Sequence, residues 1–524
     1  MSKQIYQNII VGSGPAAYAT VNALLGQGQS FLILDGGLTL SSDRQQIVDR
    51  MSNQNPLNWS NKDIADIFPT AKTSKSGVEN RNVFGSGYIY TQPENSLKIF
   101  NENSEACVSY ARGGFSNIWG AAVLPFNKDD LRDWPINYEE MQDAYNRVVK
   151  YLHITGNNDQ LQTEFPLQPP YGWKSPSMSL AAKNLREAVT LKHKNTGVLW
   201  GRARLAVDVF EGQHKCRECG TCLEGCVYGS IFSGGASWGA ELVRDHYRGG
   251  IIVKSFVEHA DCVEIVCQDI NSNLQETFMA KRLFLAAGAI GSAAIVARSS
   301  KLQGKPLRLL DAQYFFLPGL VSKKRTHEKY QRRFTLADLF FEVKSHSALY
   351  WTHFQAYGFN HIFKQAIWQT IPKILQRSFV EKFLQERFVL FQGFMNSEYS
   401  AEMSMTVSDG SIHFKREKGM QIWKMYAAIF RLQRYLGFSC ILFFFMSKAV
   451  KAARSYHIGG TFPMSKKQDG EYSDQWGRPM GLKKVFLMDA SCFPTIPATT
   501  YALSVMAHAD RVVNQLKNLS GDQL

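Results

Sequence analysis

The hydrophobic pattern at the start of the chain predicts a strand, a helix and a second strand. Residues 9–11 form a short apolar run typical of a buried parallel strand, and a helical pattern begins directly after residues 12–17. Residues 31–34 form a second apolar run that ends at an acidic residue. This succession predicts the beginning of an α/β sheet.

Further patterns divide the rest of the chain. Residues 138–148 predict an amphipathic helix, and residues 155–180, rich in Asn, Gln, Pro and Ser, predict a connecting loop. Residues 251–285 have the pattern of a small antiparallel sheet followed by a buried strand. Residues 300–454 are dense in aromatic and basic side chains, and we interpret them as a separate substrate domain.

The turn between the first strand and its helix has the spacing of a dinucleotide-binding loop. Gly12 allows the tight turn, Gly14 lets a pyrophosphate approach the backbone, and Ala17 occupies the third small position, where helix packs on strand. Asp35 ends the second strand about 20 residues past the glycines, where an acidic side chain binds a ribose hydroxyl. The motif alone leaves FAD and NAD open.

Two other segments combine small residues with turns. Residues 111–122 form a second glycine-rich loop, and residues 286–292 form a small-residue turn after the strand predicted near residue 285. Loops of this kind bring backbone N–H groups close to a bound ring or phosphate.

Composition limits the class of protein. With 524 residues, 45% hydrophobic and 20% charged, the chain is long enough for at least two folded domains. The net charge of +14 suits phosphates, lipid headgroups or nucleic acid and does not choose among them. We find no secretory signal, and the apolar run at residues 441–446 is far shorter than the roughly 20 residues of a membrane span, so we expect a cytoplasmic protein.

Taken together, these motifs resemble the glucose–methanol–choline (GMC) family of FAD-dependent oxidoreductases, especially bacterial members associated with polysaccharide gene clusters. Five segments carry the resemblance in the order that the family has them: 12–35, 112–122, 285–292, 455–464 and 489–498. The resemblance implies an α/β fold in which an FAD-binding, Rossmann-like domain accompanies a second, α+β substrate domain. The FAD-binding domain would comprise residues 1–150, 201–299 and 455–524, joined through residues 151–200 to the substrate domain at 300–454.

The resemblance also implies the residues that contact FAD. They are Gly12, Gly14, Ala17, Asp35, Gly113, Gly114, Ser116, Asn117, Trp119, Gly120, Val257, Ala287, Asp489, Ala490 and Thr495. Trp119 stands where family members commonly have Asn, which departs from the usual flavin contact. Asp489 has a second interpretation as an ordinary turn residue.

Two residues are the catalytic candidates. His457 lies beside two glycines, and a histidine with a pKa near 6.5 can accept the proton of an alcohol. The alternative, a histidine that only satisfies a buried turn, is disfavoured by the resemblance. Thr500 stands where the family often has His or Asn; its hydroxyl can contact substrate, or it can cap the helix predicted near Ala502, and both interpretations stay open.

Four cysteines have the spacing of a ferredoxin run. Cys216, Cys219, Cys222 and Cys226 follow the pattern C-x2-C-x2-C-x3-C, without the usual proline afterwards. The expectation is one iron–sulfur cluster or a purely structural role, with zinc ranked lower because its cysteine pairs normally stand further apart. A cluster would indicate a dehydrogenase.

Residues 361–390 combine apolar positions every four residues with interleaved Lys and Arg, which predicts a helix with a kink at Pro372. The stripe either packs on the substrate domain or rests on an anionic membrane at the inner membrane face.

The expected function is FAD-dependent oxidation of a CH–OH group, on a sugar or saccharide, with His457 as base and Thr500 assisting. Alternatives are a lipid or sterol-like alcohol as substrate, or a non-catalytic flavin or iron–sulfur electron-transfer subunit. The electron acceptor is open among oxygen, quinone and protein, and no nucleic acid partner is expected.

Overall fold

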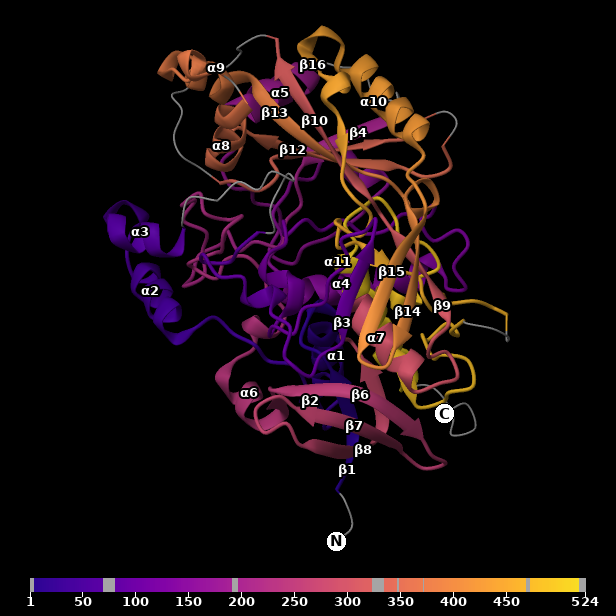
Figure 1. Ribbon diagram of the computed structural model, residues 1–524. Coiled ribbons are helices and arrows are strands. Elements are labelled where there is room, and N and C mark those ends of the chain that lie inside the picture. Colours follow the sequence, from indigo (N-terminus) through magenta and orange to yellow (C-terminus); the bar gives the residue numbers. More distant parts are fainter. Residues whose placement is uncertain are drawn as a thin grey trace.

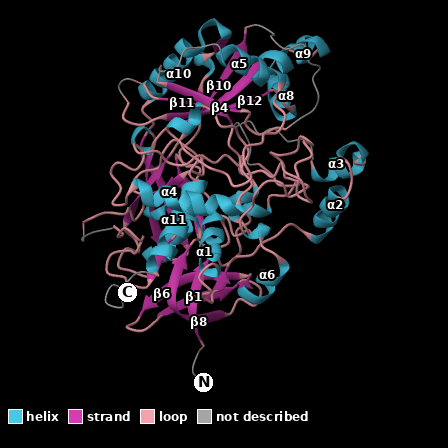
Figure 2. Ribbon diagram, turned by 180° about the vertical axis from the view of Figure 1, so that it is seen from behind, coloured by secondary structure: helices cyan, strands magenta, loops and turns pink. Residues whose placement is uncertain are grey.

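The computed structural model describes residues 4–68, 81–190, 197–322, 334–345, 348–370, 372–467 and 472–517. The molecule has two ends, each built around its own sheet, and the two ends are in contact at the middle of the molecule (Figure 1). One end holds the N-terminus and a mostly parallel sheet. The other end holds an antiparallel sheet with helices outside it (Figure 2).

The first sheet has a parallel centre. Its order is β5 (Tyr247–Arg248), β2 (Leu32–Leu34), β1 (Ile5–Val11), β8 (Gln275–Leu285), β7 (Val263–Asp269) and β6 (Ile251–Glu258), with β19 (Val485–Leu487) also pairing β8. β1 runs parallel to β2 and β8, whereas β6, β7 and β8 form an antiparallel meander. The predicted strands and the small antiparallel sheet are therefore confirmed.

Helices from both ends of the chain cover this sheet. α1 (Pro15–Leu25), α11 (Ala502–Leu516) and α4 (Tyr138–Val148) pack side by side. Ile9 and Ile10 of β1 are fully buried, as expected for a central strand with both faces covered. β19 pairs parallel to β8, so the first and last parts of the chain fold together around the glycine loop.

The second sheet forms the far wall of the molecule. Its order is β16 (Cys440–Leu442), β10 (Tyr314–Val321), β13 (Phe388–Phe394), β12 (Thr352–Gly358), β11 (Leu339–Val343) and β4 (Val198–Arg202), with β17 (Lys448–Ala449) also pairing β10. All of these pairings are antiparallel. α5 (Leu180–Thr190) and α10 (Ile422–Leu436) pack on its outer face.

A third sheet divides the segment 300–454. It contains β18 (Ile458–Gly459), β9 (Pro306–Asp311), β14 (Glu402–Ser408), β15 (Ser411–Lys418) and β3 (Lys98–Glu102). Leu307 and Met405 belong to the same buried cluster as Ile9, and α7 (Gly288–Arg298) packs against β14. β14 is buried on one face, and that face packs on the first core. Residues 300–454 were expected to form one separate domain, but three of their strands join the first core instead.

The remaining helices lie at the surface. α2 (Ser42–Ser52) and α3 (Asn61–Ile67) project at one side of the molecule and pack against Val227 and Tyr228, whereas α6 (Ala240–His246) lies beside β5 of the first sheet. α8 (His361–Thr370) and α9 (Ser378–Arg387) connect β12 to β13. The expected single kinked helix is thus two helices, because Pro372 lacks an N–H and disfavours helical backbone before it.

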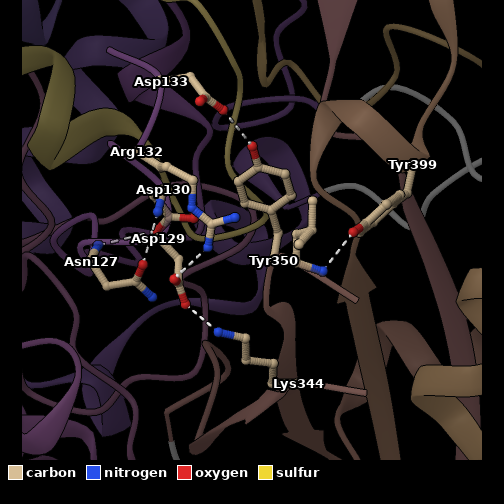
Figure 3. Close-up of polar contacts among 9 residues, drawn as sticks. Asn127, Asp129, Asp130, Arg132, Asp133, Lys344, Tyr350 and Tyr399 are labelled. Carbon is tan, nitrogen blue, oxygen red and sulfur yellow. Dashed lines mark hydrogen bonds and ion pairs between the residues drawn. The ribbon is translucent and has the colours of Figure 1, made fainter. Parts of the chain in front are cut away.

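A polar seam joins the two ends of the molecule. Asp129 pairs with Arg132 at 2.8 Å and with Lys344, which follows β11 (Figure 3). The Tyr350 hydroxyl, which precedes β12, donates to Asp133 at 3.3 Å. Asp130 is buried below them, and burial raises its pKa to about 7. These contacts hold the second sheet against the first half of the chain.

Candidate functional site

An elongated cavity of about 380 Å³ lies between the sheets. It extends from Asp35 at the end of β2 to Tyr357 on β12, and both glycine loops line it. Three separated stretches of the sequence therefore contribute to one site.

The first glycine loop has no room for side chains at its turn. Gly12 has φ +101°, and a Cβ there would come within 2.4 Å of the Ala286 carbonyl oxygen. Gly14 differs: its φ is −73°, and the nearest atom to an added Cβ is 4.0 Å away. Gly14 also begins α1 without a side-chain cap, so the first N–H groups of that helix remain available to an anion.

Asp35 presents one carboxylate oxygen to the cavity. Its Oδ2 accepts from Ser13 Oγ at 2.7 Å, from the Tyr247 hydroxyl at 2.8 Å and from the Gly37 N–H at 3.2 Å. None of these bonds uses Oδ1, which is left for a ligand hydroxyl. Burial raises the Asp35 pKa to about 6, against the lowering effect of these hydrogen bonds.

The second glycine loop is held by its own side chains. Gly113 and Gly114 have positive φ, at +87° and +57°, and the Gly113 N–H donates to Ser13 Oγ at 2.8 Å. The Asn117 amide donates to the carbonyls of Arg112 and Gly114 at 2.9 and 2.7 Å. Asn117 therefore shapes the loop and does not itself line the cavity.

Most of the residues expected at the cofactor line this cavity. They are Gly12, Gly14, Asp35, Gly113, Gly114, Ser116, Trp119, Gly120, Ala287, Asp489 and Ala490. Ala17 is fully buried within α1, and Thr495 is buried where its Oγ1 accepts from Trp134 Nε1 at 3.0 Å. The Val257 side chain is 52% exposed, since strand alternation turns it outward; residues 251–254 of the same strand line the cavity instead.

His457 lies in the cavity wall with one ring nitrogen unpaired. Its Nδ1 is buried without a hydrogen-bond partner, and the residue lines the cavity. The ring stacks on Phe394 at 5.0 Å and contacts Tyr501 at 4.8 Å. Burial lowers the His457 pKa to about 3, with a smaller contribution from His353, so the imidazole is a neutral proton acceptor at working pH.

Buried hydrogen bonds to Asp311 hold the loop that carries His457. Tyr456 has φ +57°, an uncommon backbone conformation for a residue with a side chain. Buried Asp311 accepts from the Ala453 N–H at 2.7 Å and from the Ser455 hydroxyl, whose oxygen accepts the His457 N–H at 2.9 Å. This arrangement holds the histidine backbone in a fixed position.

Thr500 does not cap the last helix. Tyr501 is the N-cap residue of α11, and no side chain caps it. Thr500 is 3% exposed, its Oγ1 has no hydrogen-bond partner, and it lines the cavity with His457. The capping interpretation is therefore wrong, and the hydroxyl is free for a ligand. Asp489 caps the turn at Ala490–Cys492, as its second interpretation predicts, and it also lines the cavity.

A row of polar residues on the second sheet was missed in the sequence. His353, Gln355 and Tyr357 alternate along β12, and the last two line the cavity with Gln392 of β13. The signal was present as polar residues at every second position in an otherwise apolar strand, but it carries no motif. Only the pairing of β12 with β13 brings Gln355 opposite Gln392.

These residues form a directed chain of hydrogen bonds. The Gln355 amide nitrogen lies 3.1 Å from His353 Nε2, so that nitrogen accepts and His353 Nδ1 donates to Glu342 at 2.5 Å. Gln355 Oε1 accepts the Tyr357 hydroxyl at 2.6 Å. Because its hydrogen is engaged, Tyr357 presents lone pairs to the cavity. Burial raises its pKa to about 12, so it stays protonated.

The four cysteines surround a separate, small cavity of about 10 Å³. The Glu218 N–H lies 3.4 Å from Cys216 Sγ, and the Ser230 N–H lies 3.2 Å from Cys226 Sγ. Among the described residues, however, no group of three or more His, Cys, Asp or Glu side chains is arranged to hold a metal ion. The arrangement thus brings the sulfurs together without supporting the expected cluster.

Comparison with known proteins identifies the C-terminal part of the chain. Residues 443–509 match the family described as GMC oxidoreductase, whose members generally bind FAD. A stretch of 241 residues, 43% of this chain, is 24% identical to the fructose dehydrogenase large subunit of Gluconobacter japonicus and spans 41% of that subunit.

A solved structure shares the whole fold. Pyridoxine 4-oxidase from Mesorbium loti superposes with a TM-score of 0.60 and 13% identity, over 98% of this chain and 100% of that one. This likeness confirms the α/β fold class. No helix in the described ranges is long and apolar enough to cross a membrane. Residues 443–509 therefore carry a GMC oxidoreductase C-terminal domain, and the chain as a whole shares its fold with the solved structure.

Proposed function

We propose that this protein is an FAD-dependent oxidoreductase that oxidises a CH–OH group of a saccharide. The observation that carries the proposal is the pair of unpartnered buried atoms, His457 Nδ1 and Thr500 Oγ1, at one end of a cavity whose other end is built from glycine loops. Buried polar groups without partners are rare in folded proteins and mark a site completed by a ligand.

The residues at the glycine end fit FAD. Gly14 and the uncapped start of α1 would hold the pyrophosphate, and Asp35 Oδ1 would accept from a ribose hydroxyl. The second loop, with Gly113 and Gly114, would bring backbone N–H groups to the cofactor. When bound, FAD supplies the acceptor for the hydride that leaves the alcohol carbon.

His457 supplies the base. Its neutral imidazole takes the hydroxyl proton of the alcohol as the C–H bond breaks, and the hydroxyl carbon becomes a carbonyl. Phe394 and Tyr501 on its two sides hold the ring orientation, which a proton acceptor in a directed reaction requires. Thr500 Oγ1, whose residue lines the same cavity, would hydrogen-bond the same substrate oxygen.

The second sheet supports a hydroxyl-rich substrate. Gln355, Tyr357 and Gln392 present amide and phenol groups, which can each pair with a sugar hydroxyl. Phe316 and Phe394 add apolar faces to the same wall. A lipid or sterol-like alcohol would place apolar surface against these polar groups and leave the remaining Tyr357 lone pairs without a donor, so the saccharide is favoured.

An anaerobic screen tests the proposal. Purified holoprotein is mixed with sugars, sugar acids, nucleotide sugars and lipid alcohols, and bleaching of the flavin absorbance is recorded. We expect bleaching with a saccharide, and a His457→Ala variant that retains FAD but bleaches slowly. A non-catalytic electron-transfer subunit would bleach with no alcohol, which would contradict the proposal.

The iron–sulfur cluster stays a prediction from cysteine spacing. Burial raises the pKa of Cys216, Cys222 and Cys226, so as free thiols they stay protonated and unreactive near neutral pH. Iron and acid-labile sulfide assays on anaerobically purified protein separate the alternatives. Absence of iron, with activity intact in a Cys222→Ser variant, would identify the run as structural.

A further inference from the structure

The end of the molecule farthest from the N-terminus is unusually apolar on its surface. Of the twenty exposed large hydrophobic side chains among the described residues, twelve lie between Ile374 and Met446. α9 and α10 lie at this end in both views, on opposite sides of it (Figures 1 and 2), and β16 lies between them in Figure 1. Scattered exposed apolar residues need no explanation, but a concentration of this kind marks an interaction surface.

The first part of this surface belongs to α10 and the segment that follows it. α10 buries Met425 and Ile429 on one side, while Trp423 and Phe430 are 58% and 54% exposed on the other. The Phe430 ring lies 5.5 Å from that of Phe444, and Phe444 lies 6.0 Å from Phe445, which is 73% exposed. These aromatic rings form a continuous ridge.

The second part belongs to α9 and the turn before it. Ile374 is 72% exposed, Phe379 is 70% exposed and Phe383 is 45% exposed. Lys373 and Arg377 are exposed among them. The apolar stripe predicted for residues 361–390 is therefore only partly buried. Phe363 contacts Tyr357 and Phe388. Phe379 and Phe383, further along the stripe, face solvent.

This end is net basic: residues 373–387 and 422–448 hold eight Lys or Arg against two acidic residues, Glu381 and Glu386. Between Glu417 and Asp469 the sequence has no acidic residue and nine Lys or Arg, and between Glu342 and Glu381 it has no acidic residue either. Arg434 and Lys448, near these phenylalanines in the sequence, are exposed. We call this surface, formed by residues 373–387 and 422–448, the basic aromatic end.

A second copy of the chain is a poor occupant for this surface. A symmetric dimer through it would place two basic surfaces together, and like charges across an interface cost several kcal/mol. An anionic lipid surface offers complementary charge and an apolar interior within reach of the rings. The positive charge of this surface therefore favours binding to an anionic membrane over binding to a second copy of the chain.

We propose that the basic aromatic end rests on the surface of an anionic bilayer. The rings of Phe430, Phe444 and Phe445 enter the boundary between headgroups and acyl chains, and Arg434 and Lys448 contact lipid phosphates. Because no described helix can span a bilayer, the attachment is interfacial. This inference is independent of the proposed reaction.

Vesicle co-sedimentation tests it with the full-length holoprotein. We expect binding to vesicles of phosphatidylcholine with phosphatidylglycerol at about 50 mM NaCl, weaker binding at about 500 mM NaCl, and little binding to phosphatidylcholine alone. The double variant Phe444→Ser/Phe445→Ser should lower the partition coefficient at least about tenfold. Arg434→Glu/Lys448→Glu should lower it and remove most of the salt dependence.

Two matched controls keep the test specific. Leu57→Ser removes a side chain that is 92% exposed on another part of the surface, and Lys301→Glu reverses an exposed charge after α7. Neither should change vesicle binding. Thermal unfolding and flavin content of every variant establish that the fold is intact.

Three results would overturn the proposal. They are the absence of binding to anionic vesicles at low salt, equal effects of the control and test variants, and a concentration-dependent dimer that the phenylalanine variants convert to monomer without any vesicle binding. The last result would assign the surface to self-association, which light scattering after size exclusion would reveal.

Discussion

The two walls of the central cavity present different groups to a ligand, main-chain atoms in one wall and side chains in the other. The wall of the first domain is mostly backbone, since Gly12, Gly14, Gly113 and Gly114 bring the main chain to the cavity surface. The wall of the second sheet is made of side chains, with Gln355 and Tyr357 pointing inward from β12.

This difference separates two kinds of recognition. A backbone wall depends on glycine at fixed positions, so it suits a ligand that is always the same, such as a cofactor. A side-chain wall can change at each position without altering the strand, so it suits a substrate that differs among relatives. His457 and Thr500 lie where the two walls meet.

The largest expected effect concerns that meeting point. His457→Ala removes the neutral base between the walls and should lower the rate of anaerobic flavin reduction about 10²–10⁴-fold. Stopped-flow measurement of flavin bleaching checks this, with FAD content measured alongside. His413→Ala, on exposed β15, is the matched control and should keep the full rate. An unchanged rate in His457→Ala would remove this residue from the reaction.

The next effect distinguishes two glycines of the backbone wall. Gly12→Ala brings a Cβ within 2.4 Å of the Ala286 carbonyl oxygen at φ +101°, and should destabilise the apoprotein by about 2–4 kcal/mol. Gly14→Ala meets no atom closer than 4.0 Å, so the apoprotein should keep its stability while FAD affinity falls at least about tenfold. Apoprotein melting and flavin titration measure the two quantities. Equal behaviour of both variants would show that Gly14 serves the fold and not the ligand.

A smaller effect follows from the buried histidine. The folded pKa of His457 is lowered to about 3, so as the pH falls below about 6.5 the unfolded chain gains a proton that the folded chain does not. His457→Asn should therefore gain about 2 kcal/mol of stability relative to the native chain between pH 6.5 and 5. Denaturant unfolding at several pH values checks this. A stability difference that stays constant with pH would show that the ring is solvated.

The smallest effect belongs to the side-chain wall. Tyr357→Phe removes one acceptor from the cavity and should raise the substrate KM about fivefold to tenfold, with FAD affinity unchanged. Steady-state kinetics with the substrate found in the flavin screen provide the measurement. Tyr350→Phe, in the polar seam between the domains, removes a hydroxyl outside the cavity and should leave KM unaltered. If Tyr357→Phe lowers FAD affinity instead, the two walls are not distinct.

A double-variant comparison sharpens the same point. His353→Ala breaks the chain that directs the Tyr357 hydrogen toward Gln355, so it should raise KM in the native background and have no further effect in Tyr357→Phe. Additive effects of the two changes would show that His353 acts only on local packing.

Much of the backbone wall could be predicted because it depends on residues that are close together in the sequence. The turn at Gly12, the helix after it and Asp35 at the end of β2 follow from spacing and periodicity within forty residues. Val257 was misplaced because one position along a strand reverses the direction of a side chain. The sequence left Thr500 open between a cap and a ligand contact because both use the same residue type, and only the structure shows that it makes no cap bond.

The sequence by itself determined the nucleotide-binding unit, the order of the family motifs and His457 as the candidate base, since each depends on neighbours along the chain. Only the tertiary structure decided that Gln355 and Gln392 face the same cavity, that β9, β14 and β15 join the first core, and that the aromatic residues of α9 and α10 gather at one end. These relations depend on strand pairing and helix packing between distant segments, and no local pattern encodes such distances.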